Sequence, residues 1–174
     1  MESKVYISAG SNVGNKMAFL AEACEKLNEH GMIKLDNVSS FYETLPYGNS
    51  NQGNFVNLVL SLKTSLRPKE LLVYLKQVER AIGRCESERW GPREIDLDIL
   101  LFDDLIYNDD ILTIPHPELL KRDFVVEPLL EIEPEISHPA AQKKIKDLLY
   151  LLESKTIIHK KLNTIFESIE ITNE

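Results

Sequence analysis

Four stretches of the chain carry the apolar, β-branched and aromatic residues that are typical of β-strands. They cover residues 4–9, 32–44, 55–65 and 95–102, and the last of them has strong strand character. Glycine and asparagine residues follow the first stretch and predict a turn there. The polar residues 45–54 have the composition of a loop, so they separate the second predicted strand from the third.

Two further segments repeat their apolar residues at helical spacing. The first covers residues 17–30 and is followed by Gly31, a residue type that commonly ends helices. The second covers residues 69–83 and has the most regular pattern in the chain, with Pro68 favouring a helix start. Five apolar side chains define the buried face of this second helix: Leu71, Leu72, Leu75, Val78 and Ile82.

The pattern is weaker beyond the fourth predicted strand. It predicts a small hairpin or turn over residues 103–113, a helix over 124–132 and a short helix over 142–152. Residues 156–174 alternate only weakly, so they predict no particular element. We therefore expect one domain over residues 1–155 and a C-terminal extension of unknown role.

The predicted elements follow the order β-α-β-β-α-β, with helical additions after it. This is the order of the ferredoxin-like fold, an α+β architecture in which helices pack on one face of a mostly antiparallel sheet. Because this fold carries many unrelated functions, the function has to be inferred from the residues of the site.

Composition narrows the class of partner. With 43% apolar residues, the 174-residue chain can build a core without disulfides. Its net charge of −8 argues against binding to nucleic acid or to an anionic membrane surface, since both require clustered Lys and Arg. No stretch of about 18 apolar residues predicts a membrane span. A nucleotide substrate is still compatible with this charge, because a metal ion can neutralise one local site.

The two cysteines, Cys24 and Cys85, do not have the spacing of metal ligands. Two thiols make no disulfide framework, so they predict unpaired cysteines in a reducing compartment. The N-terminus lacks the charged and then apolar pattern of a secretion signal. We therefore expect a cytoplasmic protein, and we expect it to be a monomer.

The strongest chemical signal lies in the fourth predicted strand. Because side chains alternate across a strand, Asp96 and Asp98 share one face, roughly 6–7 Å apart at their Cα atoms. Such a pair can bind Mg²⁺, which fills the rest of its shell with water and substrate phosphates. The alternative is two solvated acids at a strand end. The same alternation places four apolar side chains on the opposite face: Ile95, Leu97, Ile99 and Leu101.

Charged residues precede this strand in the sequence. Glu79 lies on or beside the apolar stripe of the second helix, where a carboxylate needs a partner or access to water. Arg84, Arg89 and Arg93 follow it, and guanidinium groups are the usual clamps for transferred phosphates. Each arginine taken alone could equally be a surface charge.

Aromatic and amide side chains indicate a pocket for a flat ring. On a strand, Phe55 and Asn57 point the same way, which puts a stacking ring beside an amide that can pair with a heterocycle edge. Phe124 could cover the opposite face of that ring, and Trp90 belongs to a loop that could close over it. Both phenylalanines could equally belong to the core, and His116 could be a loop residue between two prolines.

Together these residues resemble the 6-hydroxymethyl-7,8-dihydropterin pyrophosphokinase family. The most specific block is Arg89-Trp90-Gly91-Pro92-Arg93, followed by Asp96-Leu97-Asp98. Further blocks occur in family order over about residues 4–139: Ser8-Ala9-Gly10-Ser11-Asn12, Ser39-Ser40-Phe41-Tyr42-Glu43-Thr44, Phe55-Val56-Asn57, Gly83-Arg84, and Pro115-His116-Pro117 with Arg122 and Phe124.

The resemblance implies transfer of diphosphate from ATP to the hydroxymethyl group of 6-hydroxymethyl-7,8-dihydropterin, with release of AMP, in folate biosynthesis. Asp96 and Asp98 would bind two Mg²⁺ ions that bridge the ATP phosphates. Arg84 and Arg93 would stabilise the phosphates during transfer. No residue stands out as a general base.

The resemblance also implies two sets of binding residues. Those for the pterin are Thr44, Leu45, Tyr47, Phe55, Asn57, Trp90 and Phe124. Those for ATP are Glu79, Arg84, Arg93, Ile99, Thr113, His116 and Arg122. The chain departs from the family in the acidic run Cys85-Glu86-Ser87-Glu88, where relatives often have another basic residue. It also departs at Ile111, where some relatives have an arginine.

Two other functions are compatible with the same residues. One is another Mg²⁺-dependent phosphoryl or nucleotidyl transferase that uses the aspartate pair, and the other is a non-catalytic ferredoxin-like binding module. AMP formation that depends on the pterin alcohol separates the expected reaction from the first alternative. A binding module would show no metal-dependent turnover of ATP.

Overall fold

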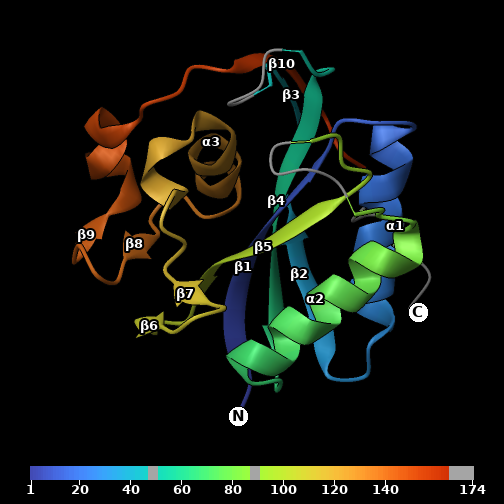
Figure 1. Ribbon diagram of the computed structural model, residues 1–174. Helices are drawn as coiled ribbons and strands as arrows, with labels where there is room; N and C mark the ends of the chain where they lie inside the picture. Colours follow the sequence, from blue (N-terminus) through green and yellow to red (C-terminus); the bar gives the residue numbers. More distant parts are fainter. Residues whose placement is uncertain (47–50, 87–90, 165–174) are drawn as a thin grey trace.

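The computed structural model describes residues 1–46, 51–86 and 91–164, and it contains α-helices packed on an antiparallel sheet (Figure 1). The main sheet consists of β1 (Ser3–Ser11), β2 (Ile33–Val38), β3 (Phe41–Thr44), β4 (Phe55–Thr64), β5 (Asp96–Phe102) and β10 (Ile157–Lys161). Five of these strands lie in the order β10-β3-β4-β1-β5, and β2 also pairs with β4. All pairings in this sheet are antiparallel.

The helices of the described residues are α1 (Lys16–Glu29), α2 (Pro68–Ile82) and α3 (Asp123–Ile132), with 3-10 turns η1 (Leu119–Lys121) and η2 (Ile145–Leu151). Two small hairpins complete the fold: β6 (Tyr107–Asn108) with β7 (Thr113–Ile114), and β8 (Ser137–His138) with β9 (Lys143–Lys144). No helix in these residues is long and apolar enough to cross a membrane.

The helices cover both faces of the sheet. In Figure 1, α1 and α2 lie on one side of the strands and α3 lies on the other. Each side has its own core: Leu20, Leu71 and Leu97 belong to the first, whereas Val59 and Leu129 belong to the second. The two helices expected within the β-α-β-β-α-β order thus lie on one face, and α3, which follows that order, covers the second face, where the interior strands are also apolar.

Local sequence signals set the ends of the first two helices within one residue of their predicted bounds. The side chain of Asn15 accepts a hydrogen bond from the Ala18 N–H and so caps α1. Glu70 accepts a hydrogen bond from the main-chain N–H of Arg67 at the start of α2. Gly83 ends α2 in the left-handed conformation, with φ of 108°, which few residues other than glycine adopt.

The predicted strand 32–44 is divided into β2 and β3 by two buried serines. The Ser39 N–H donates to the Val59 carbonyl (2.9 Å), and the Ser39 hydroxyl accepts from the Val59 N–H (3.0 Å). The hydroxyl thus takes the place of a main-chain acceptor, so β4 keeps its hydrogen bond although the neighbouring strand is interrupted. Hydrophobic patterning cannot reveal that a serine hydroxyl replaces a main-chain acceptor, because both serines count only as polar positions.

Strand β5 contains a bulge at Leu100. Tyr6 of β1 lies opposite Leu101 and Ile7 lies opposite Ile99, so Leu100 is the extra residue. Both Leu100 and Leu101 therefore pack in the core on the side of α3. Phe102 takes the place expected for Leu101 beside the other apolar residues of the strand. The two aspartates precede the bulge, so their shared face is not affected.

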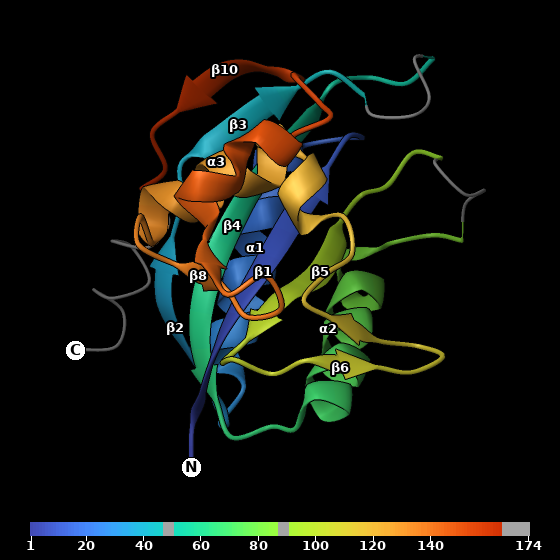
Figure 2. The ribbon, with the colours of Figure 1, turned by 90° about the vertical axis from the view of Figure 1, so that its left-hand side faces the viewer.

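The elements near the C-terminal end differ most from the expectation. The short helix expected over residues 142–152 is the 3-10 turn η2. The segment beyond it, for which no element was predicted, forms β10 and pairs with β3. Figure 2 shows β10 at the edge of the sheet beside β3, with α3 in front of the strands.

We predict that Ser39→Ala destabilises the fold by about 1–3 kcal/mol, because it leaves the buried Val59 N–H without its acceptor. Urea denaturation measures this change. The control is Ser65→Ala, which removes the hydroxyl of an exposed serine and should change the stability by less than about 0.5 kcal/mol. Equal stabilities of the two variants would contradict the role given to the Ser39 hydroxyl.

Candidate active site

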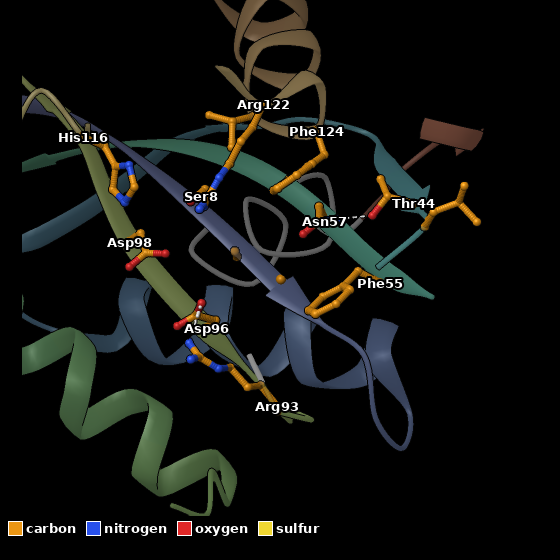
Figure 3. A pocket seen from close by; sticks show the side chains of 15 residues that line it. Ser8, Thr44, Phe55, Asn57, Arg93, Asp96, Asp98, His116, Arg122 and Phe124 are labelled. Atoms are coloured by element: carbon orange, nitrogen blue, oxygen red, sulfur yellow. Dashed lines mark hydrogen bonds and ion pairs between the residues drawn. The ribbon is translucent and has the colours of Figure 1, made fainter. Parts of the chain in front are cut away.

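A pocket of about 290 Å³ lies between the sheet and the start of α3 (Figure 3). Its floor is formed by β1, β4 and β5, which contribute Ser8, Gly10, Asn57 and the two aspartates. The sheet order explains this gathering, since β1 lies between β4 and β5. The pocket therefore combines residues that are far apart in the sequence.

Asp96 and Asp98 both line the pocket, and small residues of β1 lie beside them. Gly10 is opposite Asp96 and Ser8 is opposite Asp98 in the antiparallel register. A Cβ atom at Gly10 would lie 2.6 Å from Asn57 Oδ1, so a larger residue would displace the Asn57 amide. Burial and the neighbouring Asp96 carboxylate raise the pKa of Asp98 to about 6.

Two arginines hold the carboxylate of Asp96. Arg84 Nη1 lies 3.0 Å from Asp96 Oδ1, and Arg93 Nη1 lies 3.0 Å from Asp96 Oδ2. The arginines come from different segments, one after the end of α2 and the other just before β5. Positive charge thus gathers at the aspartate pair of a chain that is acidic overall.

Glu79 ties α2 to β5 and positions Arg84. Its buried carboxylate accepts a hydrogen bond from the Leu97 N–H (2.8 Å) and forms an ion pair with Arg84 (2.6 Å). Lys76 is a second ion-pair partner at 3.0 Å. The left-handed turn at Gly83 lets the Arg84 N–H donate to the Glu79 carbonyl. The need of Glu79 for a partner, evident from its place in the helix pattern, is met by these three groups.

Two phenylalanines face the pocket from opposite sides. Phe55 lies at the start of β4 and Phe124 lies at the start of α3 (Figure 3). Between them, the Asn57 Nδ2 donates to the Thr44 hydroxyl at 2.9 Å. This hydrogen bond fixes the Asn57 amide with its Oδ1 close to Gly10. The arrangement is an aromatic slot with an oriented amide at its base.

His116 and Arg122 line the pocket on the side of Asp98. His116 Nδ1 accepts a hydrogen bond from the Glu118 N–H, which leaves the proton of the neutral ring on Nε2. Burial, helped by the charge of Arg122, lowers the pKa of His116 to about 4. The imidazole is therefore neutral at pH 7 and can donate a hydrogen bond from Nε2.

The expected site residues are not all brought to the pocket. Leu45 lines it, but the Ile99 side chain packs in the core between the sheet and α1 and α2. Thr113 lies in β7, where its hydroxyl donates to Asn108 Oδ1. Tyr47 and Trp90 lie outside the described residues. The expectation that Trp90 belongs to a closing loop falls on the same undescribed segment.

Ser8 and Gly10 line the pocket although no role was expected for either of them. Their only signal was membership in the opening block Ser8 to Asn12. What matters is their pairing with β5, and the register of two strands separated by about 90 residues cannot be read from hydrophobic periodicity.

The donor set fits Mg²⁺ bound together with a phosphate substrate. Among the described residues no group of three or more His, Cys, Asp or Glu side chains could hold a metal ion by itself. The two pocket carboxylates are oxygen donors on one strand face, and Mg²⁺ commonly takes only one or two carboxylates. Burial and, after it, the neighbouring Asp96 carboxylate raise the pKa of Asp98, and a bound cation would favour the charged form of both acids.

Comparisons with known proteins agree on the family. The model of the family described as 7,8-dihydro-6-hydroxymethylpterin-pyrophosphokinase (HPPK) matches residues 6–134. A protein of Aquifex aeolicus named 2-amino-4-hydroxy-6-hydroxymethyldihydropteridine pyrophosphokinase is 50% identical over 143 residues, covering 82% of this chain and 88% of the relative. A Bacillus subtilis protein of the same name is 43% identical over 132 residues, covering 76% of this chain and 79% of the relative.

Among solved structures, wild-type Plasmodium falciparum HPPK-DHPS aligns with a TM-score of 0.69 at 17% identity. The alignment covers 86% of this chain and 44% of that protein, so this chain spans less than half of its length. At this identity the likeness concerns the fold alone. The family is shown by the match to the family model and by the identity to the two relatives: the chain belongs to the 7,8-dihydro-6-hydroxymethylpterin-pyrophosphokinase family.

Proposed function

We propose that this chain transfers diphosphate from ATP to 6-hydroxymethyl-7,8-dihydropterin. The hydroxymethyl oxygen forms a bond to the β-phosphorus, the bond between the α-phosphate and the β-phosphorus breaks, and AMP leaves. The observation that carries the proposal is one pocket in which an aromatic slot with an amide adjoins a carboxylate pair; Arg93 of the pocket lining and Arg84, which lies outside the lining, form ion pairs with Asp96. A flat heterocycle and a polyphosphate require these two halves side by side.

The slot between Phe55 and Phe124 would hold the pterin. Stacking on both faces buries the ring, and the fixed Asn57 amide can pair with its donor and acceptor edge. We propose that Thr44, Leu45 and Tyr47 complete the recognition of that edge. Trp90 would contact the pterin from its loop.

Asp96 and Asp98 would hold two Mg²⁺ ions. Bound there, the ions would neutralise the phosphates of ATP and hold the β-phosphorus in line for attack. Arg84 and Arg93 lie beside Asp96, so their guanidinium groups would stabilise the charge of the transferred diphosphate. Positioning and charge neutralisation account for this chemistry without an assigned general base.

Five residues would bind the rest of the nucleotide. His116 and Arg122 line the pocket, and a neutral His116 can donate from Nε2 to a phosphate oxygen. Glu79 would act from behind Arg84 by fixing the position of its guanidinium. Ile99 would contribute through its main chain, since its side chain is in the core, and Thr113 would contribute from β7.

We also propose a core fold, domain bounds, an oligomeric state and a cellular compartment for this chain. The order β5-β1-β4 followed by β3, with every pairing antiparallel, supports a ferredoxin-like core in residues 1–155. We treat residues 156–174 as the extension, although β10 joins its first part to the sheet. We also propose that the chain is a monomer and that it lies in the cytoplasm, where the thiols of Cys24 and Cys85 would stay unpaired.

An AMP-release assay tests the function directly. The wild-type chain, supplied with ATP, Mg²⁺ and the reduced pterin alcohol, should produce AMP and pterin diphosphate in equal amounts. Omission of the pterin or chelation of Mg²⁺ should stop AMP release. Production of ADP, or AMP release that ignores the pterin, would point to a different phosphoryl or nucleotidyl transferase.

We predict that Asp96→Asn and Asp98→Asn each lower kcat at least roughly 100-fold at saturating Mg²⁺, because each removes a metal-binding charge at the transferred phosphate. Circular dichroism should show an intact fold. The control is Asp104→Asn, which makes the same change at an exposed turn after β5 and should leave kcat within about twofold. Near-normal turnover of either pocket variant would exclude that residue as a metal ligand.

We predict that Phe55→Ala, Asn57→Ala and Phe124→Ala each raise the pterin Kd roughly tenfold, because each removes a stacking ring or the edge-reading amide. The Kd for Mg²⁺-ATP should change by less than about threefold, since the phosphates bind at β5. Calorimetric titration with each ligand separates the two effects. Equal weakening of both ligands would show that the residues belong to the core.

A further inference from the structure

The carboxylate of Asp123 is the most heavily hydrogen-bonded acid in the described part of the chain that lies outside the pocket. Asp123 is 8% exposed and begins α3. Four of its donors come from one C-terminal segment: the Ser154 hydroxyl (2.9 Å), the Thr156 hydroxyl (2.7 Å), the Thr156 N–H (2.6 Å) and the Ile157 N–H (3.0 Å). The Phe124 N–H is a fifth donor at 2.9 Å.

These hydrogen bonds keep the acid ionised although it is buried. Burial acts to raise the pKa of Asp123, but the hydrogen bonds from Ile157, Thr156 and Ser154 outweigh it and lower the pKa. The ion pairs of the described residues include no cation bound to Asp123. The acid is therefore held by the C-terminal segment, and the segment is held by the acid.

The neighbours of Asp123 in the sequence belong to the pocket. Arg122 and Phe124 both line it, whereas Asp123 does not. The Asp123 N–H also donates to the Ser154 hydroxyl, and the main-chain N–H groups of Glu153 and Ser154 donate to the Lys121 carbonyl. The C-terminal segment thus fixes the main chain at the point where it delivers Phe124 to the slot.

The same segment reaches the opposite side of the slot. The Thr156 carbonyl accepts a hydrogen bond from the Leu45 N–H (2.9 Å), and Ile157 pairs with Thr44 between β10 and β3. The Thr44 hydroxyl in turn orients the Asn57 amide. A continuous set of hydrogen bonds therefore runs from the start of α3, through residues 154–157, to the edge-reading end of β3.

We propose that residues 154–157 form a strap that sets the distance between Phe124 and the side of the slot that holds Thr44 and Asn57, with Asp123 as the positioning residue. The proposal rests on the proposed function, in which this slot binds the pterin. It assigns a role in substrate binding to a C-terminal segment that lines no part of the pocket. Release of the strap should loosen the slot while the aspartate pair, Arg84 and Arg93 stay in place, since Glu79 and Asp96 hold these arginines.

Glu131 provides a matched comparison within the same helix. Its carboxylate also joins α3 to β3, by accepting hydrogen bonds from the Ser40 N–H, the Ser40 hydroxyl and the Tyr42 hydroxyl. It also forms an ion pair with Lys160 of β10 at 3.3 Å. None of these partners lines the pocket. Loss of Glu131 should thus weaken the attachment of α3 to the same two strands without changing the slot.

The experiment compares Asp123→Asn with Glu131→Gln in the full chain. Asp123→Asn places an NH₂ group against an N–H donor or a hydroxyl, so we expect the pterin KM to rise roughly 10- to 100-fold through misplacement of the slot walls. The Kd for Mg²⁺-ATP should rise much less than the pterin KM, because Arg122 is the one proposed nucleotide-binding residue that adjoins Asp123, and kcat at saturating pterin should stay within about threefold. Glu131→Gln should lower the melting temperature but leave the pterin KM within about twofold.

A second variant keeps the test decisive if Asp123→Asn does not fold. Thr156→Val removes one of the hydroxyl donors at nearly constant shape, and it should raise the pterin KM several-fold in the same direction. A pterin KM that is unchanged in the folded strap variants, or that rises equally in Glu131→Gln, would overturn the strap. So would parallel losses in pterin and ATP binding. A wild-type chain that neither binds pterin nor releases AMP would instead overturn the proposed function, and the strap with it.

Discussion

The buried carboxylate of Glu79 is the constraint on which the phosphate side of the site depends. A lone ion at this depth would cost several kcal/mol, so the structure has to supply it with partners. It does so with Arg84, Lys76 and the Leu97 N–H. Because Leu97 lies between the two aspartates, the interaction that satisfies Glu79 also fixes α2 against the strand that carries Asp96 and Asp98.

The neutralisation of Glu79 continues into the pocket. Arg84 Nη1 lies within ion-pair distance of both Glu79 and Asp96, and Arg93 is the second ion-pair partner of Asp96. One charge requirement thus places two cations and one anion where the phosphates are proposed to lie. The pterin side of the pocket has a similar arrangement, since Asp123 takes its hydrogen bonds from the segment that joins α3 to β3. In both places a buried acid connects a helix to the sheet and thereby sets the geometry beside it.

Much of this molecule follows from local patterns. Helical spacing, with Gly31 after the first helix and Pro68 before the second, predicts α1 and α2 within one residue, because these signals act over one or two turns. Strand alternation correctly puts Asp96 and Asp98 on one side of β5. The divided strand at Ser39, the bulge at Leu100 and the strand β10 escape such reasoning. Each of them depends on hydrogen bonds to a partner strand that is distant in the sequence.

The types and order of residues along the chain were enough to predict the family, the elements of the core and the charged and aromatic residues of the pocket, since these are local properties of the chain. Which of those residues meet depends on how distant segments pack together. The packing places Ser8 and Gly10 beside the aspartates, the Ile99 side chain in the core, and residues 154–157 against the start of α3. Register and packing between distant segments are set by the summed burial and hydrogen bonding of the whole sheet, and no single segment encodes them.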